Sequence, residues 1–543
     1  MVKIIDTLTL EEDMAKGNLT VSEIYWVYNG LDCCITNEIR HKLREQLTPT
    51  TRATYSRALE MQGPFLEMML RGVRLSESHR TEKMIVIKEQ LSRLEYGFNR
   101  LCSEGLGLPY VLNWRSPKQV KALFYDILAY KPIKARNTMG FYAPTVGREA
   151  LETLSVNYVA EPFCNFILAM RDIGKQIGFL ETKLDADKRL RCNFNLAGTN
   201  TGRLSSSFSD FGTGTNLQNV DRNLKYTFIP DEGKAFINID LEQADSRNVG
   251  ALCWDMFVDM PREGITRLLR KAGLVKADAN WEGPIGPEFA GSYLDACESG
   301  DLHTTVCRMA WKDLDWGTVP EGWRAIADGN AYRTYSYRDM AKKLGHGTNY
   351  LGQPKTMAMH TKVPADQITL FQHNYFAAFP CIAAWQQATI ELLQTTGQLT
   401  HLFGRQRCFF GRHTDQPVIN AAIAYCPQGM TGDQINEGIL ELWKDRRFEL
   451  LIQVHDSILL QVDSRDLNEL TPVSVALMKA ERTLKQGRVF SVPLEAKVGW
   501  NWGDADKRDL SKNPSGLLDY KGNEQRTPPK FIQPKRLSLK ELR

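Results

Sequence analysis

Two apolar runs separated by a polar pair constrain this chain more than any other feature. Residues 450–454 and 458–460 are rich in Ile, Leu and Val, and His455 and Asp456 lie between them. Such runs predict strands, and two strands that meet at a tight polar break predict a hairpin. A carboxylate at the tip of that hairpin suits a metal ligand better than a core residue, because an unpaired buried charge is costly. An ordinary edge hairpin with a solvated Asp456 would have the same pattern.

A second acidic strand end follows another apolar run, residues 235–239, which ends at Asp240 and precedes a helix-like stretch, residues 244–254. Two carboxylates on two strand ends could hold a pair of divalent ions about 4 Å apart, the arrangement used for in-line attack on a phosphate. This hypothesis requires Asp240 and Asp456 to meet in the fold although they lie far apart in the sequence.

Length and composition set broad limits. At 543 residues the chain is too long for one simple core, and we expect about three subdomains. Its 43% hydrophobic and 24% charged residues are typical of a soluble globular protein. We find neither a membrane-spanning run nor a signal peptide. Eleven cysteines without a CxxC or zinc spacing indicate reduced thiols and a cytoplasmic location, the host cytoplasm if the chain is viral. A net charge of +4 permits nucleic-acid binding without indicating it.

Two residue pairs have helical spacing. Tyr28 and Asp32 are i,i+4 neighbours that could orient a metal-bound water or form a simple surface pair. Arg171 and Lys175, also four apart, could follow a phosphate backbone or merely solvate a surface. Further on, residues 193–219 form a polar stretch whose amides and Arg203 suit the acceptor pattern of a DNA minor groove.

A basic stretch, residues 338–352, places Arg338, Lys342 and His346 on one helical stripe. Two cations followed by an aromatic ring match a triphosphate and a stacked base, although a basic surface helix is common. Gly345 and Gly347 each cost a helix about 1 kcal/mol, which predicts that something approaches them closely. Before this stretch, residues 313–330 look like an insertion to which we assign no chemistry.

Several short blocks together resemble family A DNA polymerases, the bacterial DNA polymerase I type and its phage relatives. The blocks occur in the family's order, and their joint order is far more specific than any one of them. The resemblance covers about residues 59–505. The blocks are residues 201–206, 216–219, 240–247, 301–303, 338–350, 403–405, 428–429 and 453–456.

The resemblance implies an α+β right-hand fold, with a palm built on an antiparallel sheet, helical fingers and a helical thumb. Residues 1–58 would be a helical remnant that resembles the end of a 3′–5′ exonuclease domain. Residues 59–255 would form the thumb (about 76–185) and the first part of the palm. The fingers would be residues 256–399, the second part of the palm 400–505, and a flexible basic tail 506–543.

The resemblance also implies an activity and its partners. The chain would add deoxynucleotides to a primer 3′ end on a DNA template and release pyrophosphate, for phage or mobile-element replication. Its cofactor would be two Mg²⁺ ions, with Mn²⁺ as a substitute, held by Asp240, Asp456 and the carbonyl of Leu241. Arg338 and Lys342 would act in catalysis by gripping the triphosphate, and Lys342 could protonate the pyrophosphate.

The matching positions give two further sets of residues. The nucleotide-binding set is Gln243, Asp245, His303, Arg338, Lys342, His346 and Tyr350. The DNA-binding set is Arg171, Lys175, Arg203, Asn216, Gln218, Asn219, Arg247, Arg405, Gln428 and His455.

Four positions depart from the family pattern. Asp245 stands where Glu usually blocks the ribose 2′-OH, so we expect looser discrimination between sugars. His346 replaces an aromatic Phe or Tyr, Ser457 replaces a common Glu, and Ala424 replaces a frequent Asn.

Residues 28–32 resemble the third motif of a proofreading exonuclease whose earlier motifs are absent. We therefore predict no proofreading by this chain alone; a separate exonuclease polypeptide could dock on residues 1–58, and other replication proteins are possible partners. Two alternatives stay open. One is a single-subunit RNA polymerase, and the other is an inactive polymerase-like scaffold.

Overall fold

The computed structural model describes residues 8–137, 140–332 and 335–526. The chain divides into two compact units. The first contains the segment up to Glu60 together with Gly404–Gln406, and the second contains the rest. The described helices of the first unit bury none of their residues. They are α1 (Leu10–Ala15), α2 (Val21–Gln46) and α3 (Pro49–Glu60).

A five-stranded antiparallel sheet organises the second unit, with the strand order β13-β14-β8-β17-β18. The predicted hairpin is confirmed as β13 and β14, and β8 pairs with β14 on one side and with β17 on the other. Helices α18 (Gln416–Lys444) and α19 (Leu467–Met478) pack against it. The strands are β8 (Lys234–Leu241), β13 (Glu449–Val454), β14 (Ser457–Asp463), β17 (Leu494–Gly499) and β18 (Leu518–Asp519).

Side-chain alternation gives β8 two different faces. Ile237 and Ile239 are fully buried, whereas Asn238 and Asp240 on the other face are partly exposed. Glu495 and Lys497 of β17 lie opposite Asp240 and Asn238, so these four polar side chains share one open face of the sheet.

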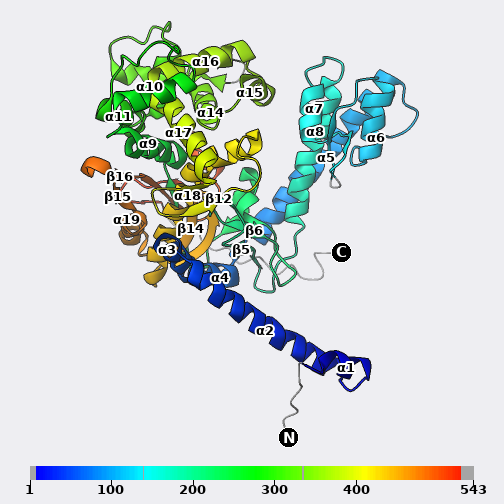
Figure 1. Ribbon diagram of the computed structural model, residues 1–543. Coiled ribbons are helices and arrows are strands. Elements are labelled where there is room, and N and C mark those ends of the chain that lie inside the picture. The colour runs from blue at the N-terminus through cyan, green and yellow to red at the C-terminus, as the bar shows by residue number, and fades with distance from the viewer. Residues whose placement is uncertain (1–7, 138–139, 333–334, 527–543) are drawn as a thin grey trace. The chain divides into compact units, whose positions relative to one another are not determined.

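Two helical regions flank the sheet (Figure 1). One contains α9 to α17, and the other contains α5 to α8, which have a hydrophobic cluster of their own. The first region comprises α9 (Ala244–Phe257), α10 (Arg262–Lys271), α11 (Gly286–Glu298), α12 (Leu302–Ala310), α13 (Pro320–Ala327), β9 (Asn330–Tyr332), β10 (Tyr335–Ser336), α14 (Tyr337–Asn349), α15 (Pro354–Thr361), α16 (Ala365–Ala378) and α17 (Pro380–Thr396). The second comprises α5 (Glu77–Arg100), η1 (Leu101–Gly105), α6 (Pro117–Lys121), η2 (Ala122–Ile127), β2 (Lys134–Arg136), β3 (Tyr142–Pro144), α7 (Arg148–Leu154) and α8 (Glu161–Leu180).

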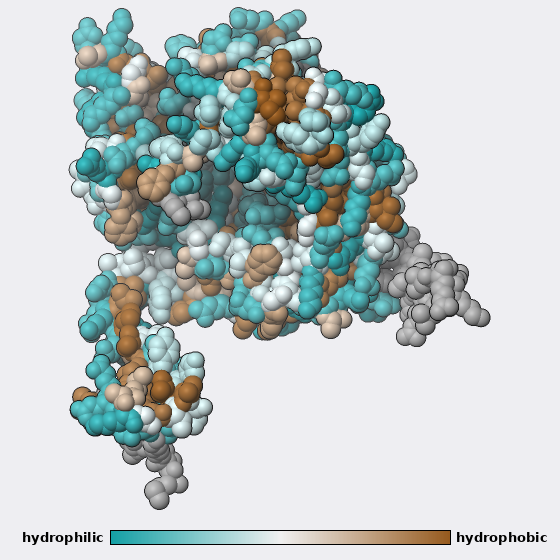
Figure 2. All heavy atoms as spheres, turned by 90° about the vertical axis from the view of Figure 1, so that its right-hand side faces the viewer, coloured by the Kyte–Doolittle hydropathy of each residue, from teal (hydrophilic) through white to brown (hydrophobic). Residues whose placement is uncertain are grey.

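Short elements connect these parts. They are α4 (Gln62–Arg71), β1 (Val73–Leu75), β4 (Arg189–Leu190), β5 (Asn193–Asn195), β6 (Ser205–Ser207), η3 (Leu217–Asn219), η4 (Arg222–Thr227), β7 (Phe228–Ile229), β11 (Gln398–Thr400), β12 (Gln406–Cys408), β15 (Glu481–Thr483), η5 (Lys485–Gly487), β16 (Val489–Ser491) and η6 (Leu510–Lys512). On the face shown in Figure 2, hydrophilic residues predominate and the apolar ones form separate patches. None of the described helices is long and apolar enough to cross a membrane.

The predicted flexible tail from residue 506 is wrong for residues 506–526. This stretch contains β18, which pairs with β17 at the edge of the sheet, and Leu517 is buried. Arg526 donates to the carbonyl oxygens of Val498 and Gly516, both at 2.7 Å. Composition alone misled the prediction, because a few backbone and guanidinium hydrogen bonds order a polar segment that lacks an apolar run. Residues 527–543 lie outside the described part.

The packing of α9 on α11 generates a stability prediction. A Cβ added at Gly250 would lie 2.9 Å from both Cα and Cβ of Leu294, whereas a Cβ at Gly178 of α8 would meet nothing within 4 Å. Gly250→Ala should therefore destabilise the protein by about 1–3 kcal/mol through overpacking. Gly178→Ala should instead stabilise its helix by up to about 1 kcal/mol. Thermal midpoints followed by circular dichroism should move in opposite directions, and equal midpoints for the two variants would contradict the packing argument.

Candidate active site

The two predicted carboxylates occupy neighbouring positions in the sheet. Asp240 is near the end of β8, and Asp456 lies in the turn between β13 and β14. Ser457 is paired with Asp240, and Leu241 donates its N–H to the carbonyl oxygen of Asp456 at 3.1 Å. The segments therefore meet as the two-carboxylate hypothesis requires.

The pKa values of both carboxyl groups are raised. Burial, and then the charge of Asp456, raise the pKa of Asp240 to about 7, against the opposing effect of Lys497. Burial also raises the pKa of Asp456. Two desolvated like charges disfavour ionisation, and a bound cation would remove that penalty. The acidic pair therefore has the electrostatics of a cation site.

The donor set fits Mg²⁺. This ion binds through one or two carboxylates and fills its remaining positions with water and substrate phosphates. Asp240, Asp456 and the carbonyl of Leu241 supply oxygen donors of this kind. Among the described residues, no cluster of three or more His, Cys, Asp or Glu side chains could hold a metal, so the site depends on these few groups.

Each aspartate lies close to a residue with left-handed backbone. Gln243 has φ 54° and ψ 33° where β8 turns into α9, and His455 has φ 55° in the hairpin turn. Such conformations cost a non-glycine residue of order 1 kcal/mol or more and cluster at functional sites. Tight turns at both positions let the two chain segments converge.

A cavity of about 990 Å³ opens above the acidic pair. Arg338, Lys342 and His346, the predicted basic stripe on α14, line it together with Asp240 and Asp456. His303 of α12 also lines it, and burial followed by the charges of Arg338 and Lys342 lowers the pKa of His303 to about 4. An acidic side and a basic side thus border the same space.

Sequence reasoning missed Arg324, which comes from the segment to which it assigned no chemistry. Arg324 lies on α13, lines the cavity and pairs with Asp301 at 3.1 Å. Arg338 pairs with the same carboxylate at 3.2 Å. Burial opposes ionisation of Asp301, but the hydrogen bonds from Arg338 and Thr304 lower its pKa to about 2. Asp301 therefore holds two guanidinium groups beside the cavity. The sequence signal was weak: one cation in a segment rich in Gly and Pro.

Asp245 is fixed by two hydrogen bonds at the start of α9. Its Oδ1 atom accepts from Arg203 Nη2 and from Thr431 Oγ1, each at 2.7 Å. The hydroxyl of the neighbouring Tyr350 is buried, and burial raises its pKa well above the ordinary value. The Tyr350 and His346 rings meet edge to face, with centroids 4.8 Å apart.

The close approach predicted at the two glycines is found at Gly347, where it comes from a protein side chain, whereas Gly345 has only an ordinary contact. A Cβ at Gly347 would lie 2.6 Å from Cε of Met357, and one at Gly345 would lie 3.5 Å from the ring of Tyr375. Gly347 lets α15 pack against α14, and Gly345 lines the cavity beside the acidic pair.

The predicted DNA-binding residues of the second unit fall into two groups, apart from Arg203, whose pairing with Asp245 is described above. The first is already engaged inside the protein: Gln218 donates to Gln453 Oε1 at 2.8 Å, Arg171 donates to the carbonyl of Val146 at 2.7 Å, Asn216 caps η3 and Arg247 is buried. The second group, Lys175, Asn219, Gln428 and His455, is at least partly exposed, while Arg405 and the Tyr28–Asp32 pair belong to the first unit.

Comparisons with known proteins give a consistent picture. The family model for "DNA polymerase family A" matches residues 82–257 and 329–504. Thermostable DNA polymerase I of Thermus filiformis is 26% identical over 454 residues, covering 80% of this chain and 46% of that protein. DNA polymerase I of Deinococcus radiodurans is 24% identical over 500 residues, covering 87% and 44%. The chain thus spans about half the length of these curated relatives.

A solved structure confirms the predicted fold. It is the POL domain of Pol1 from M. smegmatis in complex with DNA primer-template and dNTP. The TM-score is 0.59 at 21% identity, over 82% of this chain and 69% of that chain. The α+β polymerase fold is therefore shared, and because the family model matches well over half of the sequence, the chain belongs to DNA polymerase family A.

Proposed function

We propose that this chain catalyses template-directed DNA synthesis, adding deoxynucleotides to a primer 3′ end and releasing pyrophosphate. The observation that carries the proposal is a cavity bordered both by the Asp240–Asp456 pair and by Arg338 and Lys342 of α14. Family membership supports it, as do the names of the relatives and the primer-template and dNTP in the complex of the solved neighbour.

Asp240, Asp456 and the Leu241 carbonyl would hold two Mg²⁺ ions, with Mn²⁺ as a substitute. When bound, these ions would lower the pKa of the primer 3′-OH and would neutralise phosphate charge during in-line displacement. Asp240 and Asp456 would hold them. Burial raises the pKa of both carboxyl groups, and the charge of Asp456 raises that of Asp240 further.

The basic side binds and orients the triphosphate. Arg338 offers a planar fork suited to two phosphate oxygens, and Lys342 offers an exposed ammonium that can also protonate the departing pyrophosphate. His303 is neutral at pH 7, since its pKa is about 4, so it can donate a hydrogen bond to a phosphate without adding charge. Arg338 would exchange Asp301 for the substrate.

The aromatic and polar residues beside α9 would select the nucleotide. His346 and Tyr350 offer ring surfaces to the base, and Gln243 has a buried Oε1 atom without a partner in the described part of the chain. Asp245 would lie near the sugar, where its carboxylate disfavours a 2′-OH. Arg203, Gln428 and His455 would contact the primer-terminal region.

We further propose that this chain does not proofread alone. Asp32 is the single carboxylate of the exonuclease-like motif, and one such ligand does not complete a two-metal site. Tyr25, Trp26 and Tyr28 on α2 are each at least 65% exposed. These exposed aromatic side chains would suit contact with a separate exonuclease polypeptide or another replication protein, in phage or mobile-element replication.

Asp456→Asn tests the metal-ligand assignment. The amide keeps the side-chain volume but removes the charge, so kcat for primer extension should fall by at least about 10³-fold, equal to about 4 kcal/mol. Binding of primer-template should change little. Asp463→Asn is the matched control, because Asp463 ends the same hairpin and is paired with Arg465. Near-normal extension by Asp456→Asn would refute the assignment, and rapid 3′–5′ digestion of the primer without dNTPs would refute the absence of proofreading.

Asp245→Glu tests the role of Asp245 at the sugar. One more methylene brings the carboxylate closer to a 2′-OH, so the ratio of kcat/KM for dNTP over rNTP should rise about tenfold, a difference of about 1.4 kcal/mol. Asp255→Glu adds the same methylene near the other end of α9 and should leave the ratio unchanged. An identical ratio in wild type and Asp245→Glu would exclude Asp245 from sugar selection.

A further inference from the structure

A second hollow, of about 660 Å³, is lined by five cations and lies close to the acidic pair. Lys497 lines this hollow, and Glu495, on the same face of β17, lines the cavity above the acidic pair. The hollow and that cavity therefore lie next to each other along β17. The charges of Lys497 and Lys225 also lower the pKa of Asp240 against the effect of burial. The basic hollow therefore adjoins the site at which a primer end would react. The five cations are Lys83, Arg222, Lys497, Lys507 and Lys512.

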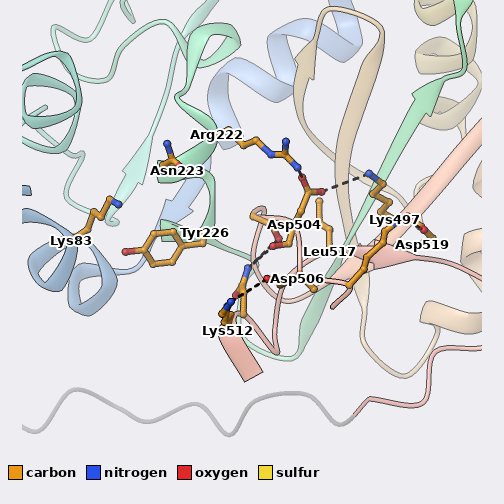
Figure 3. A pocket seen from close by; sticks show the side chains of 14 residues that line it. Lys83, Arg222, Asn223, Tyr226, Lys497, Asp504, Asp506, Lys512, Leu517 and Asp519 are labelled. Carbon is orange, nitrogen blue, oxygen red and sulfur yellow. Dashed lines mark hydrogen bonds and ion pairs between the residues drawn. The ribbon is translucent and has the colours of Figure 1, made fainter. Parts of the chain in front are cut away.

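Much of this hollow is built by the segment that follows the family match. The match ends at residue 504, and residues 505–519 supply one wall, including Lys507 and Lys512. The pairing of β18 with β17 holds this segment against the sheet. The opposite wall comes from Lys83 on α5 and from η4, as Figure 3 shows.

Three carboxylates orient most of these cations. Asp504 accepts from Arg222 at 2.8 Å and lies 3.6 Å from Lys497, Asp506 lies 3.7 Å from Lys512, and Asp519 pairs with Lys507 (Figure 3). Asp509 also lies 3.7 Å from Lys512, and Glu495 lies 4.0 Å from Lys497, so Lys83 is the one lining cation without an ion pair in the described part of the chain. Surface ion pairs of this kind are weak enough to exchange partners, so the paired cations also remain available to a phosphate.

We propose that this hollow binds phosphates of the nucleic-acid backbone next to the primer end, as a contact that the C-terminal extension adds. The inference rests on the proposed function and concerns affinity for DNA, not the chemical step. Each phosphate neutralised by a lysine releases condensed counterions, so the salt dependence of DNA binding counts such contacts.

The test compares two double variants in DNA binding. Lys83→Ala with Lys512→Ala should weaken binding of a primer-template at least fivefold at 0.1 M salt. It should also reduce the slope of log K against log salt by about 1–2. Lys444→Ala with Lys479→Ala removes two exposed lysines that are paired with glutamates outside the hollow, and should leave both values unchanged.

At saturating DNA, kcat should be the same for the hollow variant and wild type, which separates this test from that of the proposed function. Equal affinity and equal salt slope for the two double variants would overturn the proposal.

A different observation identifies a positioning residue for Asp245. Thr431 is fully buried in α18, and its hydroxyl accepts from Asn248 Nδ2 at 3.0 Å. Its single proton can go to Asp245 Oδ1 at 2.7 Å or to the Pro427 carbonyl at 3.1 Å, and the charged, closer acceptor is the stronger one. The hydroxyl thus relays a buried amide donor to the Asp245 carboxylate.

We infer that Thr431 sets the position of Asp245 and thereby the discrimination between sugars, a role that rests on the proposed function. Arg203 donates to the same Oδ1 atom of Asp245. In the proposed function Arg203 also contacts the primer, so Arg203 alone would not fix the position of the Asp245 carboxylate during synthesis. Thr431 is the contact that would persist during synthesis.

Thr431→Val and Thr431→Ser form a matched pair, because Val keeps the shape and loses the hydroxyl whereas Ser keeps the hydroxyl. The kcat/KM ratio for dNTP over rNTP should change at least fivefold in Thr431→Val and less than twofold in Thr431→Ser. A purely structural role would affect both nucleotides equally and leave the ratio unchanged in both variants, which would overturn the inference. If wild type itself extends no primer, the proposed function fails instead.

Discussion

The register between β14 and β8 is the constraint on which this structure depends. Ser457 opposite Asp240 brings the Asp456 turn beside the end of β8, and a shift of one residue would turn the buried side chains of both strands to the wrong face. The hydrophobic core therefore enforces the meeting of two carboxylates that repel each other. Burial of Ile237, Ile239, Ile458 and Leu460 stabilises an arrangement that is electrostatically unfavourable without a cation.

On the opposite side of the cavity, positive charges lie close together, and carboxylates of the protein offset their repulsion. Arg338 and Arg324 gather positive charge at one border, where Asp301 pairs with both of them and Asp328 also pairs with Arg324. The same principle recurs at Asp245, which is paired with Arg203. Each of these three guanidinium groups thus has an internal carboxylate partner in the free protein. In the proposed function, substrate binding would exchange one ionic partner for another, which costs less than removing a bare charge from water.

Sequence reasoning succeeded where a local pattern determines position. The hairpin, the helix that begins at residue 244 and the basic stripe of α14 follow from apolar periodicity, and the order of the short blocks indicated the family. It failed where tertiary contacts decide. Gln218 fits an exposed DNA contact by its motif, yet it is buried against Gln453. Arg324 reaches the cavity only because α13 packs beside α12, and the strand β18 forms only because an open sheet edge is available to it.

The environment of Asp245 connects residues that lie far apart in the sequence. The side chain of Asp245 is one methylene shorter than that of a glutamate. The buried Thr431 hydroxyl on α18 donates a hydrogen bond to its carboxylate. Asn248, one turn after Asp245 on α9, donates to that hydroxyl, so α9 and α18 hold the carboxylate together. Pro427 strengthens this arrangement, because its carbonyl accepts from Asn248 at 3.2 Å where α18 contains a proline. The position of one carboxylate is thus a property of two packed helices, and a change in either helix should shift that carboxylate.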